Sequence, residues 1–179
     1  GTKLISVCGH VQRPGNYEVT MGTPMKDLIF DMCGGMKPGR TLKAVIPGGS
    51  SVPIMTAAET EDCCLDYEGV VARGSMLGSA GMIVMDDSTD MVYQIWRLAR
   101  FYAHESCAQC TQCREGTAWT TKILERILAG KGKAADLDLL LSLSENMTGK
   151  TICVLSDSCA APIVSGIAKF RSEFDAYLS

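Results

Sequence analysis

The chain has 179 residues, of which 46% are hydrophobic and 21% are charged, with a formal net charge of -3. This length suffices for one medium or two small globular domains, and the apolar runs are too short for direct membrane insertion, so a soluble polypeptide is expected. The acidic balance and the scatter of Lys and Arg disfavour a nucleic-acid partner.

The first half of the chain has β-type runs separated by glycine and proline. Leu4 to Cys8 and Tyr17 to Val19 flank the dipeptide Pro14-Gly15, which predicts a hairpin. Further strands are predicted at Leu42 to Ile46 and at Met82 to Met85.

One helix is predicted among these strands. Thr23-Pro24 is typical of a helix start, and the segment Met25 to Cys33 ends at Gly34-Gly35, a helix stop. Strands with a single helix packed on a mixed sheet form a small α+β domain, which we expect over residues 1–87.

The second half follows the helical period. In the first predicted helix, apolar residues recur behind a cap at Ser88 or Thr89; they are Met91, Ile95, Leu98 and Tyr102. The second helix has an apolar face of Trp119, Ile123, Leu124, Ile127 and Leu128.

Two more helices are predicted, one from about Ala134 to Met147 and one from roughly Ser158 to Phe170. Their apolar positions are Leu137, Leu140, Leu141, Ile163, Val164 and Ile167. Short connections predict an all-α four-helix bundle over residues 88–179.

Three cysteines at three-residue spacing, Cys107, Cys110 and Cys113, lie between the first two predicted helices. Thiolates at this spacing fit three corners of a 4Fe-4S cluster, whose fourth ligand must come from elsewhere. Cys153 lies between the last two helices, at the same end of an up-and-down bundle, and is the candidate. A structural zinc site is the alternative, although zinc sites usually pair their cysteines two and two.

Other residues near the site have weaker claims. Arg114 is expected to begin a helix whose positive end faces the cluster. Cys159 competes with Cys153 but falls where the last helix is expected to start, so a free thiol is preferred. His104 is expected to contact solvent or a carbonyl rather than metal, and no partner is named for His10.

The remaining cysteines are expected to be structural thiols. Nine cysteines without a signal peptide favour a reducing compartment and metal ligation over disulfides. Those in the first domain are Cys8, Cys33, Cys63 and Cys64. No catalytic residues stand out, and no nucleotide fingerprint for FMN or NAD is present.

The run from Glu105 to Gly116 together with Thr151-Ile-Cys153 resembles the family of NADH-binding flavoproteins of respiratory complex I. Segments 1–11, 44–51 and 74–87 are similar to the middle domain of that family, so the resemblance covers the whole chain. It implies a β-grasp (ubiquitin-like) domain of the soluble-ligand-binding type, followed by a helical iron-sulfur domain. Cys107, Cys110, Cys113 and Cys153 match the family's four cluster ligands.

The resemblance also implies a function as part of an NADH-quinone oxidoreductase. Electrons would pass from flavin on a missing N-terminal domain, which holds FMN and NADH, through the 4Fe-4S cluster. The implied partners are the thioredoxin-like small iron-sulfur subunit and the large iron-sulfur subunit. The implied location is cytoplasmic and peripheral to the inner membrane in bacteria, or the matrix side in mitochondria.

Two alternatives to this function are open. Related diaphorase subunits of NAD-linked hydrogenases and formate dehydrogenases share the motifs, and a non-redox interaction module with structural zinc is the competing class. The chain departs from the family at Ala108, where glycine is usual, at Gln112, where proline is usual, and at Cys159, an uncommon addition. These departures imply a slightly less rigid loop.

Overall fold

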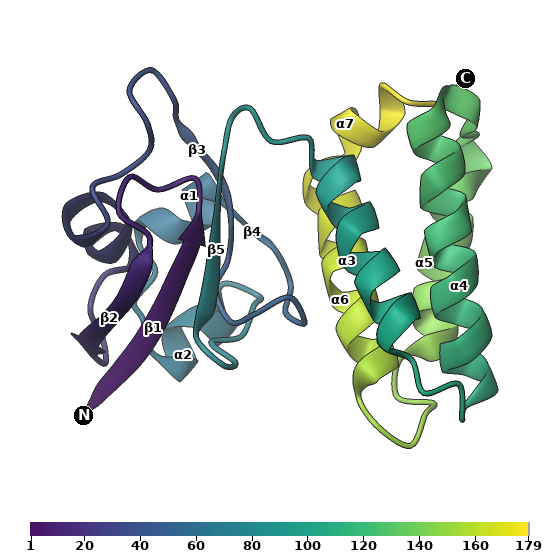
Figure 1. The fold of residues 1–179 in the computed structure, drawn as a ribbon, viewed down its shortest axis with the longest axis horizontal. Helices are drawn as coiled ribbons and strands as arrows, with labels where there is room; N and C mark the ends of the chain where they lie inside the picture. The colour runs from purple at the N-terminus through teal and green to yellow at the C-terminus, as the bar shows by residue number, and fades with distance from the viewer. Residues whose placement is uncertain (179) are drawn as a thin grey trace. The chain divides into compact units, whose positions relative to one another are not determined.

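A computed structural model describes residues 1–178, in which the chain forms two compact units divided between Thr89 and Asp90. The first unit combines a sheet with short helices, and the second is helical (Figure 1). The architecture is therefore α+β, as the sequence predicts. The domains expected at 1–87 and 88–179 remain a prediction about independent folding.

The first unit contains a five-stranded mixed sheet with strand order β2-β1-β5-β3-β4. The strands are β1 (Thr2–Gly9), β2 (Gly15–Thr20), β3 (Leu42–Ile46), β4 (Met55–Thr56) and β5 (Gly81–Asp86). β1 and β2 form the expected antiparallel hairpin, and β1 runs parallel to β5 with Val7 opposite Met82. Only the two-residue β4 has no counterpart among the predicted strands.

The expected helix of this unit is present, but its core is π-helical. η1 (Asp27–Met32) continues a helical turn at Met25, and the Cys33 amide donates to the Leu28 carbonyl, five residues back, at 2.9 Å. Leu28 and Ile29 are fully buried in the same hydrophobic cluster as the sheet residues.

Two short helices follow that the sequence reading missed. α1 (Ala57–Glu61) begins with a capping box between Thr56 and Glu59, and Asp66 caps α2 (Tyr67–Ala72) by accepting from the Gly69 amide. Both caps are local sequence signals, but each helix is too short to show an apolar period.

The second unit is built from four long helices and two shorter segments. They are α3 (Met91–Glu105), α4 (Thr111–Arg126), η2 (Ile127–Lys131), α5 (Ala134–Met147), α6 (Leu155–Lys169) and α7 (Arg171–Asp175). α3 and α5 each pack on both α4 and α6. This arrangement brings the α3–α4 and α5–α6 connections to the same end of the unit (Figure 1).

The buried faces of these helices differ in detail from the predicted ones. On α3 the buried stripe includes Ala99, whereas Leu98 is half-buried. On α4, Ile123 and Leu124 are buried, but Trp119 is 50% exposed.

The cap of α3 also differs from the predicted one. It is Asp90, which accepts from the Tyr93 amide at 3.0 Å, rather than Ser88 or Thr89. All three residue types are favoured at the N-cap position, so residue type alone does not separate these neighbours.

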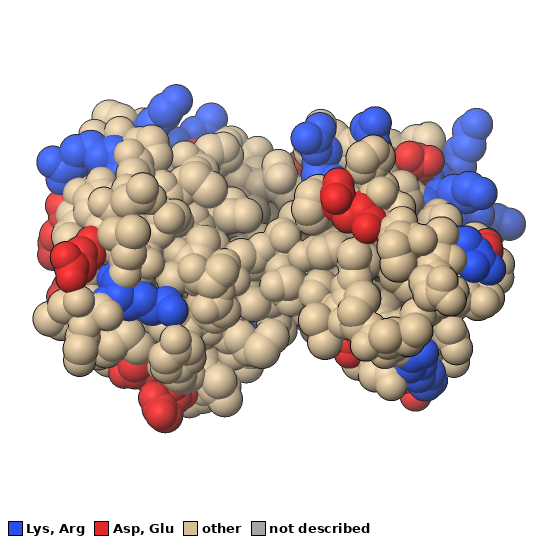
Figure 2. Space-filling view, turned by 60° about the horizontal axis from the view of Figure 1, so that its bottom comes forward, with Lys and Arg blue, Asp and Glu red and all other residues tan. Residues whose placement is uncertain are grey.

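None of the helices among residues 1–178 combines the length and the apolar composition that a membrane span requires. On the face drawn in Figure 2, Lys and Arg side chains are interspersed with Asp and Glu, and much of the surface carries neither charge.

A buried carboxylate fixes the start of α5. Asp136 is 6% exposed, forms an ion pair with Arg126 and accepts from the Lys133 amide at 2.9 Å. Hydrogen bonds from Arg126 hold the pKa of Asp136 below its usual 3.8, although burial alone would raise it. Because the folded-state pKa is lowered, this stabilisation is complete above pH 3.8 and is lost as the pH falls through the folded-state value.

We predict that Asp136→Asn lowers the free energy of unfolding by about 1–3 kcal/mol at neutral pH. The deficit should shrink as the pH falls below 3.8. Urea unfolding followed by tryptophan fluorescence measures both effects, since Trp96 and Trp119 lie in the helical unit. Asp138→Asn, an exposed site on the same helix, should cost less than about 1 kcal/mol. Equal losses in the two variants would contradict this account.

Candidate metal centre

The cysteine triplet spans the α3–α4 connection and the first turn of α4. Cys107 is exposed in the connection, Cys110 is the half-buried N-cap of α4, and Cys113 is on the helix with 7% exposure. The expectation that Arg114 begins this helix is therefore wrong, since α4 begins at Thr111. The first turn holds no large apolar residue, so the hydrophobic period does not reveal it.

Hydrogen bonds hold the triplet loop in one shape. Ser106 Oγ accepts from the Ala108 amide at 3.3 Å and lies 3.3 Å from Cys113 Sγ. Arg114 Nη1 donates to the Ala108 carbonyl at 2.8 Å, and Arg114 also pairs with Glu115. Ala108 has φ 63°, in the left-handed region that favours glycine.

Cys153 lies in the α5–α6 connection, residues 148–154, and is exposed. Its neighbour Ile152 donates its backbone N–H to Cys110 Sγ at 3.4 Å. The Thr151 hydroxyl donates to the Cys153 carbonyl at 2.8 Å and lies 2.6 Å from Ser156 Oγ on α6. The two cysteine loops therefore meet, with Cys153 adjacent in sequence to the residue that contacts Cys110.

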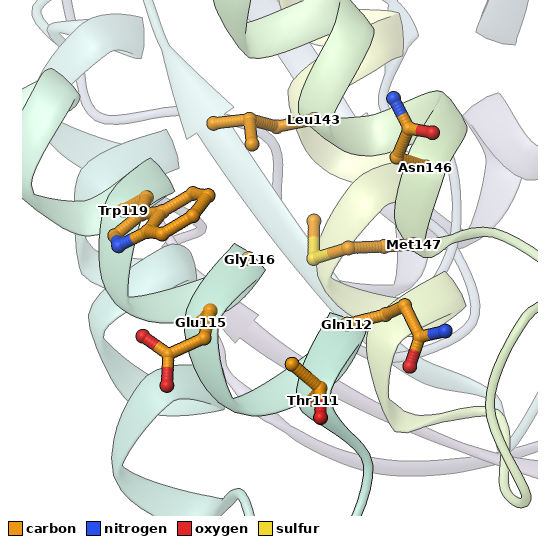
Figure 3. Close-up of a pocket in the computed structure, with 8 residues that line it drawn as sticks. All are labelled: Thr111, Gln112, Glu115, Gly116, Trp119, Leu143, Asn146 and Met147. Carbon is orange, nitrogen blue, oxygen red and sulfur yellow. The ribbon is translucent and has the colours of Figure 1, made fainter.

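Close packing of α4 on α5 positions these loops. A Cβ at Gly116 would meet Met147 Sδ at 2.5 Å, so glycine is what admits the Met147 side chain at this crossing. Beside this contact is a hollow of about 290 Å³ between the two helices, lined in part by Trp119 and Leu143 (Figure 3). The crossing lies one turn after Cys113 and at the end of α5, immediately before the Cys153 loop.

Cys159 has a different environment from Cys153. α6 begins at Leu155, three residues before the predicted start, so Cys159 lies within the helix and is 0% exposed. Burial, with a smaller contribution from the nearby Cys113, raises the pKa of Cys159 to about 12. A thiol of that pKa is protonated at neutral pH and is a poor metal ligand.

The other candidate groups lie apart from the triplet. Cys33 and Cys63 are buried, and Cys8 and Cys64 belong to the same first unit. His104 is exposed and its Nδ1 lies 3.0 Å from Glu105 Oε1. His10 pairs with the buried Asp86 at 2.9 Å, a partner that the sequence reading did not find.

Within residues 1–178, no three His, Cys, Asp or Glu side chains are gathered closely enough to hold one metal ion. A cluster of four irons binds each thiolate at a different iron, so its ligands are spread more widely than those of one ion. The donor set fits such a cluster, because four cysteines lie on two loops that touch through Ile152 and Cys110. These cysteines are Cys107, Cys110, Cys113 and Cys153.

Two groups around these sulfurs were missed by sequence reasoning. The Ser106 hydroxyl and the Ile152 amide both lie within hydrogen-bonding distance of a cysteine sulfur. Ser106 directly precedes the triplet, which is a signal that could have been used. The Ile152 contact crosses between two loops and has no local signal.

Two family models match the chain in succession. The SLBB domain matches residues 3–93, and the NADH-ubiquinone oxidoreductase-F iron-sulfur binding region matches residues 93–177.

Similar proteins include an F chain of NADH-quinone oxidoreductase, number 1, of Rhizobium meliloti (strain 1021), which is 48% identical over 98% of this chain and 41% of that protein. The corresponding protein of Streptomyces coelicolor is 47% identical over 100% of this chain and 39% of that protein. The chain therefore spans about two fifths of the length of these curated relatives.

A similar fold occurs in a solved structure. A chain in the crystal structure of an NAD+-reducing [NiFe]-hydrogenase in the H2-reduced state superposes with a TM-score of 0.86 and 33% identity. The match covers 100% of this chain and 30% of that chain.

We predict that Ala108→Gly stabilises the helical unit by about 0.5–1 kcal/mol. The left-handed conformation costs alanine about 1–2 kcal/mol, which exceeds the entropic cost of about 0.5–1 kcal/mol that glycine adds. Urea unfolding monitored by tryptophan fluorescence gives the free energy. Ala103→Gly, within α3, is the matched control and should destabilise by about 1 kcal/mol. A loss of stability in both variants would contradict the backbone argument.

Proposed function

This chain belongs to the family that joins an SLBB domain to the NADH-ubiquinone oxidoreductase-F iron-sulfur binding region, and we propose on that premise that it relays electrons. The proposed ligands of one 4Fe-4S cluster are Cys107, Cys110, Cys113 and Cys153. The chain itself is proposed to perform no bond chemistry.

One observation carries this proposal, the hydrogen bond from the Ile152 amide to Cys110 Sγ at 3.4 Å. It links the triplet loop to the connection that holds Cys153, although the two are far apart in sequence. Cys153 is exposed, whereas Cys159 is enclosed in α6, and this difference favours Cys153 as the fourth ligand.

The start of α4 is suited to the negative charge of such a site. α4 has no side-chain cap, and Arg114 is the first residue whose amide bonds back within the turn, to the Cys110 carbonyl at 2.9 Å. The amides of Thr111, Gln112 and Cys113 precede it and lack an intrahelical acceptor. Their N–H groups and the positive end of the helix favour thiolates and added negative charge nearby.

When bound, a 4Fe-4S cluster takes up and releases one electron at a time. The four cysteines hold it, and the burial of Cys113 keeps water from one side. The Thr151 hydroxyl fixes the Cys153 carbonyl and so orients that loop. Arg114 fixes the triplet loop through the Ala108 carbonyl.

The source and destination of the electrons follow from the family. We propose that they come from flavin reduced by NADH, on the part of the relatives that this chain does not cover. They pass to a thioredoxin-like small iron-sulfur subunit and a large iron-sulfur subunit. We place the assembly at the inner membrane as a peripheral part, on the cytoplasmic side in bacteria or the matrix side in mitochondria.

The finer fold assignment is also a proposal. A mixed sheet whose first and last long strands, β1 and β5, run parallel supports a β-grasp domain. Mutual packing of α3, α4, α5 and α6 supports a four-helix bundle. We place the domain boundary at residues 87–88.

The second candidate is the corresponding segment of a diaphorase subunit. The fold likeness to the NAD+-reducing [NiFe]-hydrogenase chain favours it, with a TM-score of 0.86. Identity is 33% there against 48% to the Rhizobium meliloti protein, so the NADH-quinone oxidoreductase assignment is preferred.

We predict that Cys153→Ser abolishes the intact cluster whereas Cys159→Ser retains it. Serine offers a harder, less readily deprotonated oxygen at the ligand position. Iron, zinc and sulfide analysis with absorption spectra, under anaerobic conditions, measures cluster content in both variants and the parent. The reverse pattern would show that Cys159 is the ligand. A colourless parent protein with one zinc per chain would refute electron transfer.

We also predict that removal of the cluster loosens the helical unit and leaves the first unit folded. The ligands come from two connections of the helical unit, so cluster binding stabilises that unit alone. Hydrogen exchange on the cluster-loaded and cluster-free forms measures amide protection in α4 and α6, with β1 and β5 as the internal control. Equal protection of α4 and α6 in both forms would count against the ligand assignment.

A further inference from the structure

Ser106 directly precedes the cysteine triplet and has no role in the ligand set described above. Its side chain is half-buried, and its Oγ lies 3.3 Å from Cys113 Sγ. The same oxygen lies 3.3 Å from the Ala108 amide nitrogen. The serine hydroxyl thus sits between a backbone donor and a cysteine sulfur.

The direction of the hydroxyl proton follows from these two neighbours. The Ala108 N–H can only donate, so Ser106 Oγ accepts there with a lone pair. A cysteine that binds metal is a thiolate and has no proton to give. When Cys113 is a ligand, the hydrogen bond between the two side chains must therefore run from the Ser106 hydroxyl to the sulfur.

We propose that Ser106 is a positioning residue that donates a hydrogen bond to the Cys113 thiolate and thereby raises the reduction potential of the cluster. The inference rests on the proposed function, because it requires Cys113 to be a cluster ligand. It adds a group that tunes the electron relay without contacting the electron donor or acceptor.

The effect on the potential has an electrostatic cause. One-electron reduction adds one negative charge, shared by the cluster and its thiolates, and makes or breaks no bond. A hydroxyl proton pointed at a thiolate stabilises the more negative, reduced state. Cys113 is 7% exposed whereas Cys107 and Cys153 are exposed, so this bond is the least screened by water.

Ser106 is also held in place before any metal binds. The Ala108 amide anchors its oxygen, and Arg114 anchors the Ala108 carbonyl at 2.8 Å. Little reorientation is then needed when the charge on the sulfur increases. The Ile152 amide also donates to a cysteine sulfur, but a side-chain substitution cannot remove that donor.

The test compares Ser106→Ala, Ser106→Thr and Ser158→Ala in the intact protein that carries this chain, purified anaerobically with its cluster. Ser158 is the matched control because it is also a serine near a cysteine loop, but its Oγ donates to the Val154 carbonyl at 2.8 Å. The measurement is the midpoint potential from a redox titration followed by electron paramagnetic resonance. Iron and sulfide content is determined for each variant.

The expected result is a more negative midpoint potential in Ser106→Ala at unchanged cluster content. Ser106→Thr keeps a hydroxyl and should retain the parent potential, as should Ser158→Ala. An unchanged potential in Ser106→Ala with a full cluster would overturn the role of Ser106 alone. Absence of an iron-sulfur cluster from the parent protein would instead overturn the proposed function.

Ser106→Thr decides the matter if Ser106→Ala does not retain its cluster. A threonine variant with full cluster content at the parent potential supports the hydroxyl donor. A threonine variant that has lost its cluster, or whose potential falls, overturns it, because the hydroxyl is still present.

Discussion

The metal-binding end of the helical unit depends on how closely α4 approaches α5 at Gly116. The Met147 side chain occupies the space where any larger residue would place its Cβ. Ser156 Oγ donates to the Met147 carbonyl at 3.2 Å, which ties the first turn of α6 to the end of α5. The connection between α5 and α6 is held at both ends, and its Ile152 amide reaches Cys110. Two cysteine loops meet because two helices pack at the distance that a glycine permits.

Local patterns predicted the elements whose residues carry their own signal. Helix α5 has the predicted limits, Ala134–Met147, because its apolar residues recur at the helical period over its length. Helices α4 and α6 both begin three residues earlier than predicted. Their first turns start with Thr111 and Leu155, beside small or polar residues that leave no apolar stripe to detect.

The candidate site divides in the same way between local and distant information. Spacing alone indicates that Cys107, Cys110 and Cys113 act together, because a short loop limits how far apart they can be. The contact between Ile152 and Cys110 depends on helix packing, and no spacing predicts it. The pairing of His10 with Asp86 likewise requires β1 beside β5, a parallel pairing between opposite ends of the first unit.

The environments of the four cysteines are unequal, and this bears on what can control a cluster bound to them. Cys107 and Cys153 are exposed, and Ile152 and Val154, on either side of Cys153, are 86% and 73% exposed. At those sulfurs, solvent supplies much of the polarisation. Cys113 is shielded, so nearby groups of the chain itself dominate its electrostatics. Hydrogen bonding and solvent exposure both set the potential of an iron-sulfur centre, and here they act on different members of the ligand set.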